Sequence, residues 1–455
     1  MVKEGDDKIE AEVERLYRSH FGRLVGSMLS KYRDLPLEVV EDMVQDSFAA
    51  ALETWSRDGV PERPAAWIYV VVRNRVVNQL RAEKKLWIAE VEDTDDNLQI
   101  DWDKDKGKIV DDDQLRLLFA CAHPELSPKV QVAVTLKYVV NLKVRAIAAV
   151  LGTNEDSIEK LLFRARGKLR EKKMFMGEPG CGQLGLRLPV VHKIIYLIFN
   201  EGYKPAAGDA LLKEELCGEA LILAKALVDN RLGNKATQAL YALMLFNAAR
   251  LKARLGPDGA LLDLEEQDRS LWSKPLILMA CEWLTRAREG IDAGGSGRSG
   301  GGAEARGGSV RGSGAGAGSG ELSSYHVEAT IAWVHCTAVD FASTDWGLVS
   351  RLYERLMEWG ANPWVELSYA IALYYSGGKG RDSGEKGRAF GILERLLRMP
   401  IMYQYYPLNV TMGKLYALEG DRYRSEVYYR RALELTVLPG EVDFIRRQLG
   451  RLRTG

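Results

Sequence analysis

Apolar residues recur at spacings of three and four residues along most of the chain, and the strict alternation typical of β-strands is scarce. Residues 39–55 show the pattern clearly, because their apolar and polar positions fall on different faces of a helix. One face carries Val40, Val44, Phe48, Ala51 and Trp55, and another carries Glu41, Asp42, Gln45, Asp46 and Glu53. The periodicity predicts an all-α protein.

A second amphipathic helix is predicted after a loop containing Gly59, Pro61 and Pro64. Its apolar residues are expected to pack inward: Trp67, Val71, Val72, Val76 and Leu80. Its other face gathers amide and guanidinium groups: Arg73, Asn74, Arg75, Asn78, Gln79 and Arg81. Such a face suits the phosphates and unstacked bases of a single strand. The alternative is a helical bundle whose charges are simply solvated.

Residues 129–165 predict a helix-turn-helix. Gly152 can adopt the positive φ of a sharp turn, and Thr153 or Asn154 can cap the helix that follows. That helix is expected to bury Ile158, Leu161, Leu162 and Ala165. Residues at its N-terminal end are candidate readers of base edges: Asn154, Ser157, Glu159 and Lys160. Basic residues further along would mostly meet phosphates: Arg164, Arg166 and Lys168. An ordinary helical hairpin with a basic, solvated face is the alternative.

Composition divides the chain into successive zones. Residues 8–88 and 113–173 are helical units that each end in a basic run, and the acidic segment 89–112 between them is predicted to be a linker. Residues 178–455 form a longer helical region. It is interrupted at 290–320 by glycine, serine, alanine and arginine, which predict a disordered insert.

Charge and cysteine content exclude several classes of protein. The formal net charge is zero, so any nucleic-acid surface must come from local segregation of charge. The five cysteines are widely spaced without a CxxC pair, so neither a disulfide framework nor a zinc site is predicted, and a reducing compartment is expected. The acidic N-terminus has no signal-peptide pattern, and no run reaches the roughly 18 apolar residues that span a bilayer. We predict no cofactor, no metal and no membrane association.

Two motifs in this order resemble the extracytoplasmic-function (ECF) sigma factors. Glu41, Asp42, Gln45, Asp46 and Phe48, followed by RPAAW and RNRVVNQLR, resemble the region 2 domain of that family. The segment AIAAVLGTNEDSIEKLLFRARGKLR (146–170) resembles region 4, and the acidic segment lies where the family has its inter-domain linker.

The resemblance implies two small helical domains and a function in promoter recognition without catalysis. Asp42, Gln45, Asp46 and Phe48 would dock on the clamp helices of the largest subunit of RNA polymerase. The helix carrying Arg73–Arg81 would hold the melted −10 element, and the helix that begins near Asn154 would read the −35 element. The expected location is the cytoplasm, at the nucleoid when polymerase is bound. The sequence departs from the family at Asn78, where an acidic residue is more usual.

Residues 178–455 resemble the tetratricopeptide-like extension of one subgroup of these sigma factors. Matching stretches are LIFNEGY (197–203), ALYALMLFNAARLKAR (239–254), LEEQDRSLW (264–272) and AWVHCTAVDFASTDW (332–346). The final repeat has small and aromatic residues at the spacing of a 34-residue repeat: Gly413, Tyr416, Gly420, Tyr429 and Ala432, with Ser425 where alanine is usual. A weaker copy covers 362–397. Stacked hairpins of this kind predict a surface for a protein partner or an intramolecular contact, through which the sigma activity would be regulated.

Polar residues of the extension allow an enzymatic interpretation, which we do not favour. Glu265, Glu266 and Asp268 could act as acids or bases, with His192, His326 or His335, but no nucleophile elbow, phosphate loop or metal spacing accompanies them. We expect Gln267, Arg269 and Trp272 to bridge helices. Two alternatives to the sigma-factor hypothesis remain: a polymerase-independent helix-turn-helix regulator, and a helical-repeat adaptor that has lost DNA activity.

Overall fold

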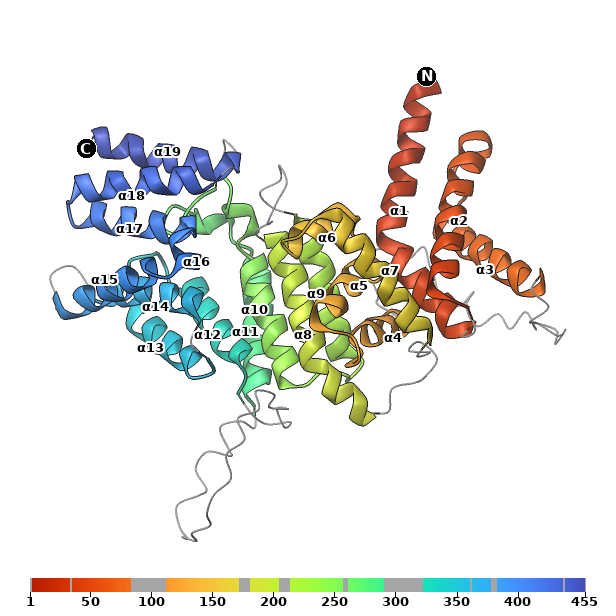
Figure 1. Ribbon diagram of the computed structural model, residues 1–455, viewed down its shortest axis with the longest axis horizontal. Coiled ribbons are helices and arrows are strands. Elements are labelled where there is room, and N and C mark those ends of the chain that lie inside the picture. Colours follow the sequence, from red (N-terminus) through yellow and green to blue (C-terminus); the bar gives the residue numbers. More distant parts are fainter. Residues whose placement is uncertain are drawn as a thin grey trace, which may run out of the picture. The chain divides into compact units, whose positions relative to one another are not determined.

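The computed structural model describes most of the chain as helix. The described residues are 2–32, 35–82, 112–171, 181–203, 213–256, 261–289, 322–360, 362–377, 383–436 and 438–454. Within them the only strand-like pairing is an isolated bridge between Leu255 and Leu261, so the all-α prediction is confirmed (Figure 1). Nearly all of the predicted linker 89–112 and all of the predicted insert 290–320 lie outside the described residues.

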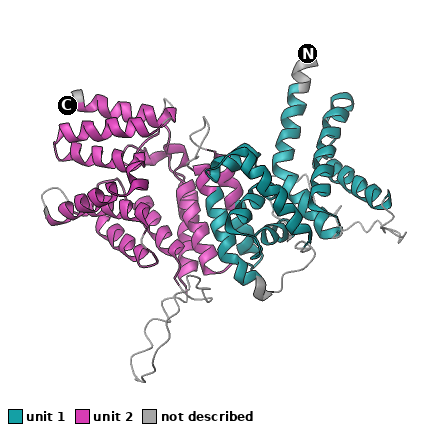
Figure 2. Cartoon of the chain, viewed as in Figure 1, with its two compact units in different colours: residues 1–198, 222–232 teal, residues 199–221, 233–455 magenta. Residues whose placement is uncertain are grey.

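The chain forms two compact units (Figure 2). The first contains residues 1–198 and 222–232, and the second contains 199–221 and 233–455. The division therefore passes through two helices, α8 (Cys181–Tyr203) and α9 (Glu214–Asp229), and not through the acidic segment between the two predicted domains.

The first unit joins the two predicted helical domains in one core. Its remaining helices are α1 (Val2–Lys31), α2 (Leu37–Asp58), α3 (Pro64–Ala82), α4 (Asp112–Cys121), α5 (Pro128–Tyr138), α6 (Val144–Val150) and α7 (Glu155–Glu171). Helix α1 packs against α2 and α3 on one side and against α4 and α5 on the other. It buries Phe21, Leu24, Val25 and Met28 completely.

Two glycines allow α1 to approach its neighbours closely. A Cβ atom at Gly22 would lie 2.5 Å from the carbonyl oxygen of Val139, just after α5. A Cβ atom at Gly26 would lie 2.8 Å from the carbonyl oxygen of Asp113 in α4. Both distances are too short for any larger residue, so this packing depends on glycine at one face of α1.

The residues predicted to be buried match the structure in α2 but only partly in α3. All five apolar residues predicted to be inside α2 are buried. In α3, Trp67 and Val71 are only half-buried, and the buried face instead contains Ile68, Tyr69 and Val77. Tyr69 on this face accepts a hydrogen bond from Lys31 Nζ of α1 at 2.8 Å.

The second unit is a series of helical hairpins. Its helices are η2 (Leu251–Ala253), η3 (Arg269–Leu271), α10 (Lys235–Ala248), α11 (Lys274–Arg288), α12 (Ser324–Thr337), α13 (Trp346–Met357), α14 (Pro363–Ser376), α15 (Ser383–Leu397), α16 (Pro400–Tyr403), α17 (Tyr406–Leu418), α18 (Arg422–Leu435) and α19 (Pro439–Thr454). Helix α10 contacts both α11 and α12 and is almost entirely buried.

The last helices have the close packing that the repeat pattern predicts. Helix α17 packs on α18, and α18 packs on α19 (Figure 1). A Cβ atom at Gly413 would lie 3.0 Å from the ring of Tyr429, and Ala432 is fully buried. Ser425 is also fully buried, and its hydroxyl donates a hydrogen bond to the carbonyl of Gly413 at 2.7 Å. Serine therefore fits this small-residue position because the neighbouring backbone satisfies its hydroxyl.

Candidate nucleic-acid interface

Helix α2 has an exposed acidic face and a buried aromatic residue that holds the helix in place. The side chains of Asp42, Gln45 and Asp46 are exposed on one face. Phe48, predicted with them as a contact residue, is only 4% exposed and packs edge-on against Tyr17 with ring centroids 5.0 Å apart. Phe48 thus holds α2 in place and does not present its ring at this surface.

Glu41 departs from the solvent-facing polar face predicted for α2. Its side chain is 7% exposed, and its Oε1 lies 3.0 Å from Nζ of Lys137 in α5. The amide of Gln45 also donates to Glu41 Oε1, at 3.2 Å. A buried carboxylate needs such partners to offset the loss of hydration, and the lysine that supplies the charge comes from the second predicted domain.

Asp42 is held in an unfavourable electrostatic environment. Partial burial raises the pKa of its carboxyl group, and the nearby carboxylates of Glu41 and Asp46 raise it further. The guanidinium of Arg166 acts in the opposite direction. The exposed face of α2 therefore concentrates negative charge beyond what its cations neutralise.

Helix α3 carries the basic face that the sequence predicts. Asn74, Arg75, Asn78 and Arg81 are exposed, whereas Arg73 and Gln79 are half-buried. One guanidinium nitrogen of Arg75 lies 3.8 Å from Asp46 Oδ2, so the basic face of α3 borders the acidic surface of α2. This is a long, solvent-exposed pair that contributes little stability and leaves Arg75 available to an anion.

Helices α6 and α7 form the predicted helix-turn-helix. Gly152 has φ = 59°, and the Oδ1 atom of Asn154 accepts a hydrogen bond from the backbone of Ser157 at 2.9 Å. Both predicted features of the turn are therefore present, and Asn154 is the cap. Ile158, Leu162, Ala165 and Leu169 are buried, while Leu161 is half-buried.

The candidate DNA-reading residues of α7 are accessible at its N-terminal end. Asn154, Ser157, Glu159 and Lys160 are all exposed. Arg164 is exposed as well, and its Nε donates to the backbone carbonyl of Lys160 at 3.2 Å. This end of α7 can therefore meet the edges of bases in a groove.

The other basic residues of α7 are engaged within the first unit. Arg166 is half-buried, and its Nε is buried without a hydrogen-bond partner among the described residues. Lys168 donates to the backbone carbonyl of Glu125. Arg170, part of the basic run that ends this domain, lies 2.9 Å from Glu38 Oε1 in α2. The C-terminal half of α7 is thus directed at the acidic surface of α2 and the loop before α5.

Phe163 is an exposed aromatic residue of α7 that the sequence pattern did not identify as a candidate contact. Phe163 is 75% exposed on α7, beside Arg164. It lies off the buried stripe of Ile158, Leu162 and Ala165, and that mismatch was the available signal. An exposed phenylalanine on such a helix can contact the methyl group of thymine or a protein partner.

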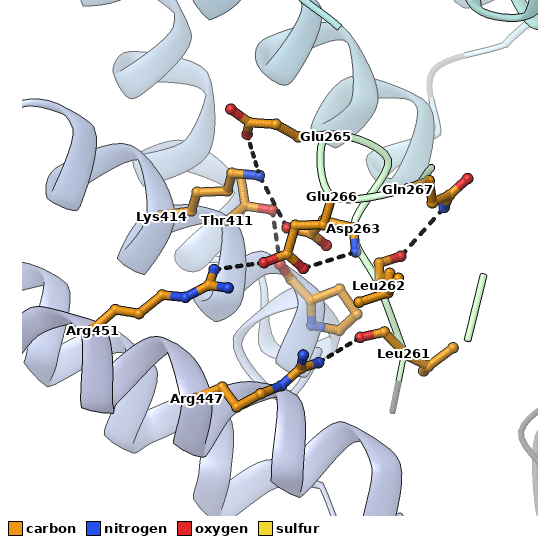
Figure 3. Close-up of polar contacts among 11 residues, drawn as sticks. Leu261, Leu262, Asp263, Glu265, Glu266, Gln267, Thr411, Lys414, Arg447 and Arg451 are labelled. Carbon is orange, nitrogen blue, oxygen red and sulfur yellow. Dashed lines mark hydrogen bonds and ion pairs between the residues drawn. The ribbon is translucent and has the colours of Figure 1, made fainter. Parts of the chain in front are cut away.

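The motif at 264–272 serves structural contacts in the second unit, and Figure 3 shows those of Glu265, Glu266 and Gln267. Asp268 caps η3 by accepting from the backbone of Ser270 at 2.8 Å, and Arg269 donates to the carbonyl of His335 at 2.8 Å. Glu266 pairs with Arg451 of α19 at 2.5 Å. Arg269 also stacks on Trp272, with its guanidinium 4.6 Å from the ring centroid. Of the residues predicted to bridge helices, Arg269 joins the loop to α12, whereas the Gln267 amide donates to Leu262 within the loop, and the contact with α19 comes from Glu266.

The histidines considered as acids or bases are buried or half-buried in the structure. Burial lowers the pKa of His192 and of His335 to about 4, and it lowers that of His326, whose ring completes the capping box at the start of α12. Among the described residues there is no cluster of ligands suited to a metal ion. In the same part of the chain, no helix has the length and hydropathy to cross a membrane.

Family models match three segments of the chain. Residues 16–86 match sigma-70 region 2, and residues 116–169 match sigma-70 region 4. Residues 187–288 match a family of unknown function. The two sigma-70 matches cover the helices α2, α3 and α5–α7 that carry the candidate surfaces.

Comparison with curated proteins gives relatives of two kinds. The "Uncharacterized protein R00370" of Rhizobium meliloti (strain 1021) is 30% identical over 432 residues, which cover 94% of this chain and 93% of that protein. The "Probable ECF RNA polymerase sigma factor SigI" of two Mycobacterium tuberculosis strains is 25% identical over 206 residues, which cover 44% of this chain and 66% of that protein. No solved structure gives a significant match.

Proposed function

Because the chain belongs to the ECF-like sigma factors that carry a C-terminal helical extension, we propose that it binds core RNA polymerase and directs transcription from specific promoters. The observation that carries this proposal is the ordered pair of sigma-70 matches, each on helices whose candidate contact residues are mostly exposed. Residues 8–88 would act as the polymerase-binding and −10 domain, 113–173 as the −35 domain, and 178–455 as the extension.

Core polymerase would dock on α2 through Asp42, Gln45 and Asp46. These residues form an exposed, net negative face whose charge is incompletely neutralised within the chain, and such a face suits basic residues on the clamp helices of the largest subunit. Phe48 would contribute by positioning α2, because its ring is buried.

Promoter DNA would be held by two surfaces. On α3, the arginines and amides would grip the melted −10 strand: Arg73, Asn74, Arg75, Asn78, Gln79 and Arg81. On α7, the exposed N-terminal residues would read the −35 element, with Arg164 on a phosphate: Asn154, Ser157, Glu159 and Lys160. Lys168 would reach a phosphate only after leaving the backbone carbonyl of Glu125, and Arg166 only after leaving the neighbourhood of the Asp42 carboxylate.

Regulation would involve release of α7 from α2. The pairs Arg170–Glu38 and Lys137–Glu41 hold the helix-turn-helix domain against the helix that would bind polymerase. The helical hairpins of the extension would control this release by binding a protein partner or another part of the chain, since stacked hairpins expose a broad surface for recognition.

The test is co-purification with core polymerase, followed by runoff transcription on genomic fragments. Replacement of both Asp42 and Asp46 by alanine should abolish both activities. Glu53→Ala, a change of the same kind at another exposed carboxylate of α2, should leave both intact. If DNA binding is specific but polymerase never co-purifies, the chain is a polymerase-independent regulator.

The adaptor alternative has its own test. Replacing Arg73, Arg75 and Arg164 by alanine should weaken promoter binding and reduce its dependence on salt. Each phosphate contact releases counterions from the DNA when it forms, so a variant that makes fewer contacts releases fewer counterions on binding. Unchanged binding would show that these surfaces do not contact DNA.

A further inference from the structure

A cavity of about 270 Å³ lies within the second unit. Its floor and walls come from α12, α13, α14 and α17, and the segment Asp263–Glu265 of the motif loop lies at one side. The volume is close to the lower limit of about 300 Å³ for typical ligand pockets. It can admit a small molecule.

Aromatic rings form most of one wall. Trp346 lies 4.9 Å from Phe341 and 4.9 Å from Tyr375, measured between ring centroids. Phe341 and Tyr375 meet edge-to-face at 5.0 Å, and His335 contacts Trp346 at 5.3 Å. Because each ring is fixed by at least one other, the wall is a preorganised apolar surface, and little side-chain entropy would be lost on binding.

The polar side of the cavity carries more negative than positive charge. Lys414 Nζ lies 3.0 Å from Asp263 Oδ2 and 3.0 Å from Glu265 Oε2, so two carboxylates share one ammonium (Figure 3). His335 adds no charge at neutral pH, because burial lowers its pKa to about 4. The charge of this group is therefore negative, and the half-exposed Glu265, with 45% of its side chain accessible, is the carboxylate that a ligand can reach.

One unused hydrogen-bonding atom lies on a residue of the same lining. Nδ1 of His335 is buried without a hydrogen-bond partner among the described residues, whereas the hydroxyl of Tyr375 interacts with Lys414. Buried polar atoms are usually paired, and their exceptions often mark a missing water or ligand. Neighbouring Glu266 is not available, because it pairs with Arg451.

We propose that this cavity is a binding site for a small organic cation, a primary ammonium on an aromatic or apolar body. The ammonium would pair with Glu265 in place of Lys414, and Lys414 would remain paired with Asp263. The apolar body of the ligand would lie against Trp346, Phe341 and Tyr375. An anion is disfavoured because the only lysine of the lining is already saturated by two carboxylates. The site is separate from the proposed polymerase and DNA surfaces.

Three probes of one shape and different charge test the proposal on the full chain: 2-phenylethylammonium, 2-phenylethanol and phenylacetate. Isothermal titration and thermal melting should show saturable binding of the ammonium, with the neutral alcohol at least about tenfold weaker and phenylacetate undetectable. Equal binding of the alcohol would show a merely apolar pocket. Preferential binding of phenylacetate, or no binding by any of the probes, would overturn the proposal.

A matched pair of variants locates the site. Glu265→Gln should weaken 2-phenylethylammonium about tenfold. Glu434→Gln, the same change at a carboxylate that pairs with Arg431 on α18, should leave the affinity unchanged. Melting of each variant without ligand identifies any loss of fold, and a folded Glu265→Gln protein with unaltered affinity would contradict the assignment.

Discussion

Asp42 combines exposure with an unfavourable charge environment. Its raised pKa means that the folded chain disfavours the carboxylate relative to the unfolded chain, so ionised Asp42 does not stabilise the fold at neutral pH. An exposed residue whose charge the fold disfavours in this way is a good candidate for a contact with a partner.

We therefore predict opposite effects of Asp42→Asn on stability and on binding. The melting temperature should be retained or rise, because repulsion from Glu41 and Asp46 is removed. Affinity for core polymerase should fall about tenfold, as for loss of a central contact in an interface. Calorimetry and a polymerase pull-down measure the two effects, with Glu53→Gln as the control. A variant that melts earlier yet binds polymerase normally would contradict the proposed contact.

Gly22 illustrates a steric requirement at a single position. In Gly22→Ala the new Cβ would clash with the carbonyl of Val139, so we expect a loss of about 1–3 kcal/mol in the free energy of unfolding. Gly185→Ala is the matched control. That glycine lies in α8 with open space around the Cβ position, so alanine should be neutral or stabilise by about 0.5–1 kcal/mol. Urea unfolding compares the two, and equal effects would argue against close packing at α1.

At the scale of elements, the contact between α2 and α7 sets how accessible the helix-turn-helix is. The pair Glu38–Arg170 is partly exposed and contributes at most about 1 kcal/mol. Glu38→Lys should replace the attraction to Arg170 by repulsion and so make α7 more accessible. We expect its affinity for a promoter duplex to be about threefold higher than that of a variant with the same net charge.

Glu53→Lys on the same helix is the control for net charge, since it adds the same charge at another exposed site. Fluorescence anisotropy at low and high salt is the measurement, because screening should remove the difference between the variants. If both variants bind DNA equally at low salt, the α2–α7 contact does not restrain α7.

At the scale of the whole molecule, each compact unit contains a buried neutral histidine. His192 lies in the first unit and His335 in the second, and burial lowers the pKa of each from 6.5 to about 4. Unfolding exposes the rings, and the unfolded chain then binds protons that the folded chain does not. Stability is therefore complete above about pH 7 and is lost as the pH falls through 6.5 towards 4.

Each histidine should cost about 2 kcal/mol of stability by pH 5. Calorimetry between pH 7.5 and 5 should show both units melting earlier on acidification. His192→Leu should remove the part of this loss that belongs to the first unit and leave the second unit unchanged. A pH-independent melting profile of the wild-type chain would show that neither ring stays neutral and buried.

The sequence by itself determined the features that depend on nearby residues. Helical periodicity identified the buried face of α2, from Val40 to Trp55, because the apolar side chains of one helix must share a face to leave water. The turn before α7 followed from Gly152 and Asn154, whose preferences for positive φ and for capping are local properties of the backbone.

Only the tertiary structure decided which distant groups meet. Glu41 and Arg166 looked solvent-exposed from periodicity, yet they lie between α2 and the helix-turn-helix domain, where Lys137 of α5 pairs with Glu41. The cavity likewise joins Glu265 of a loop to Lys414, about 150 residues later. The periodicity of a helix indicates which of its faces is buried and which is exposed. It does not indicate which element packs on the buried face, because that depends on residues far away in the sequence.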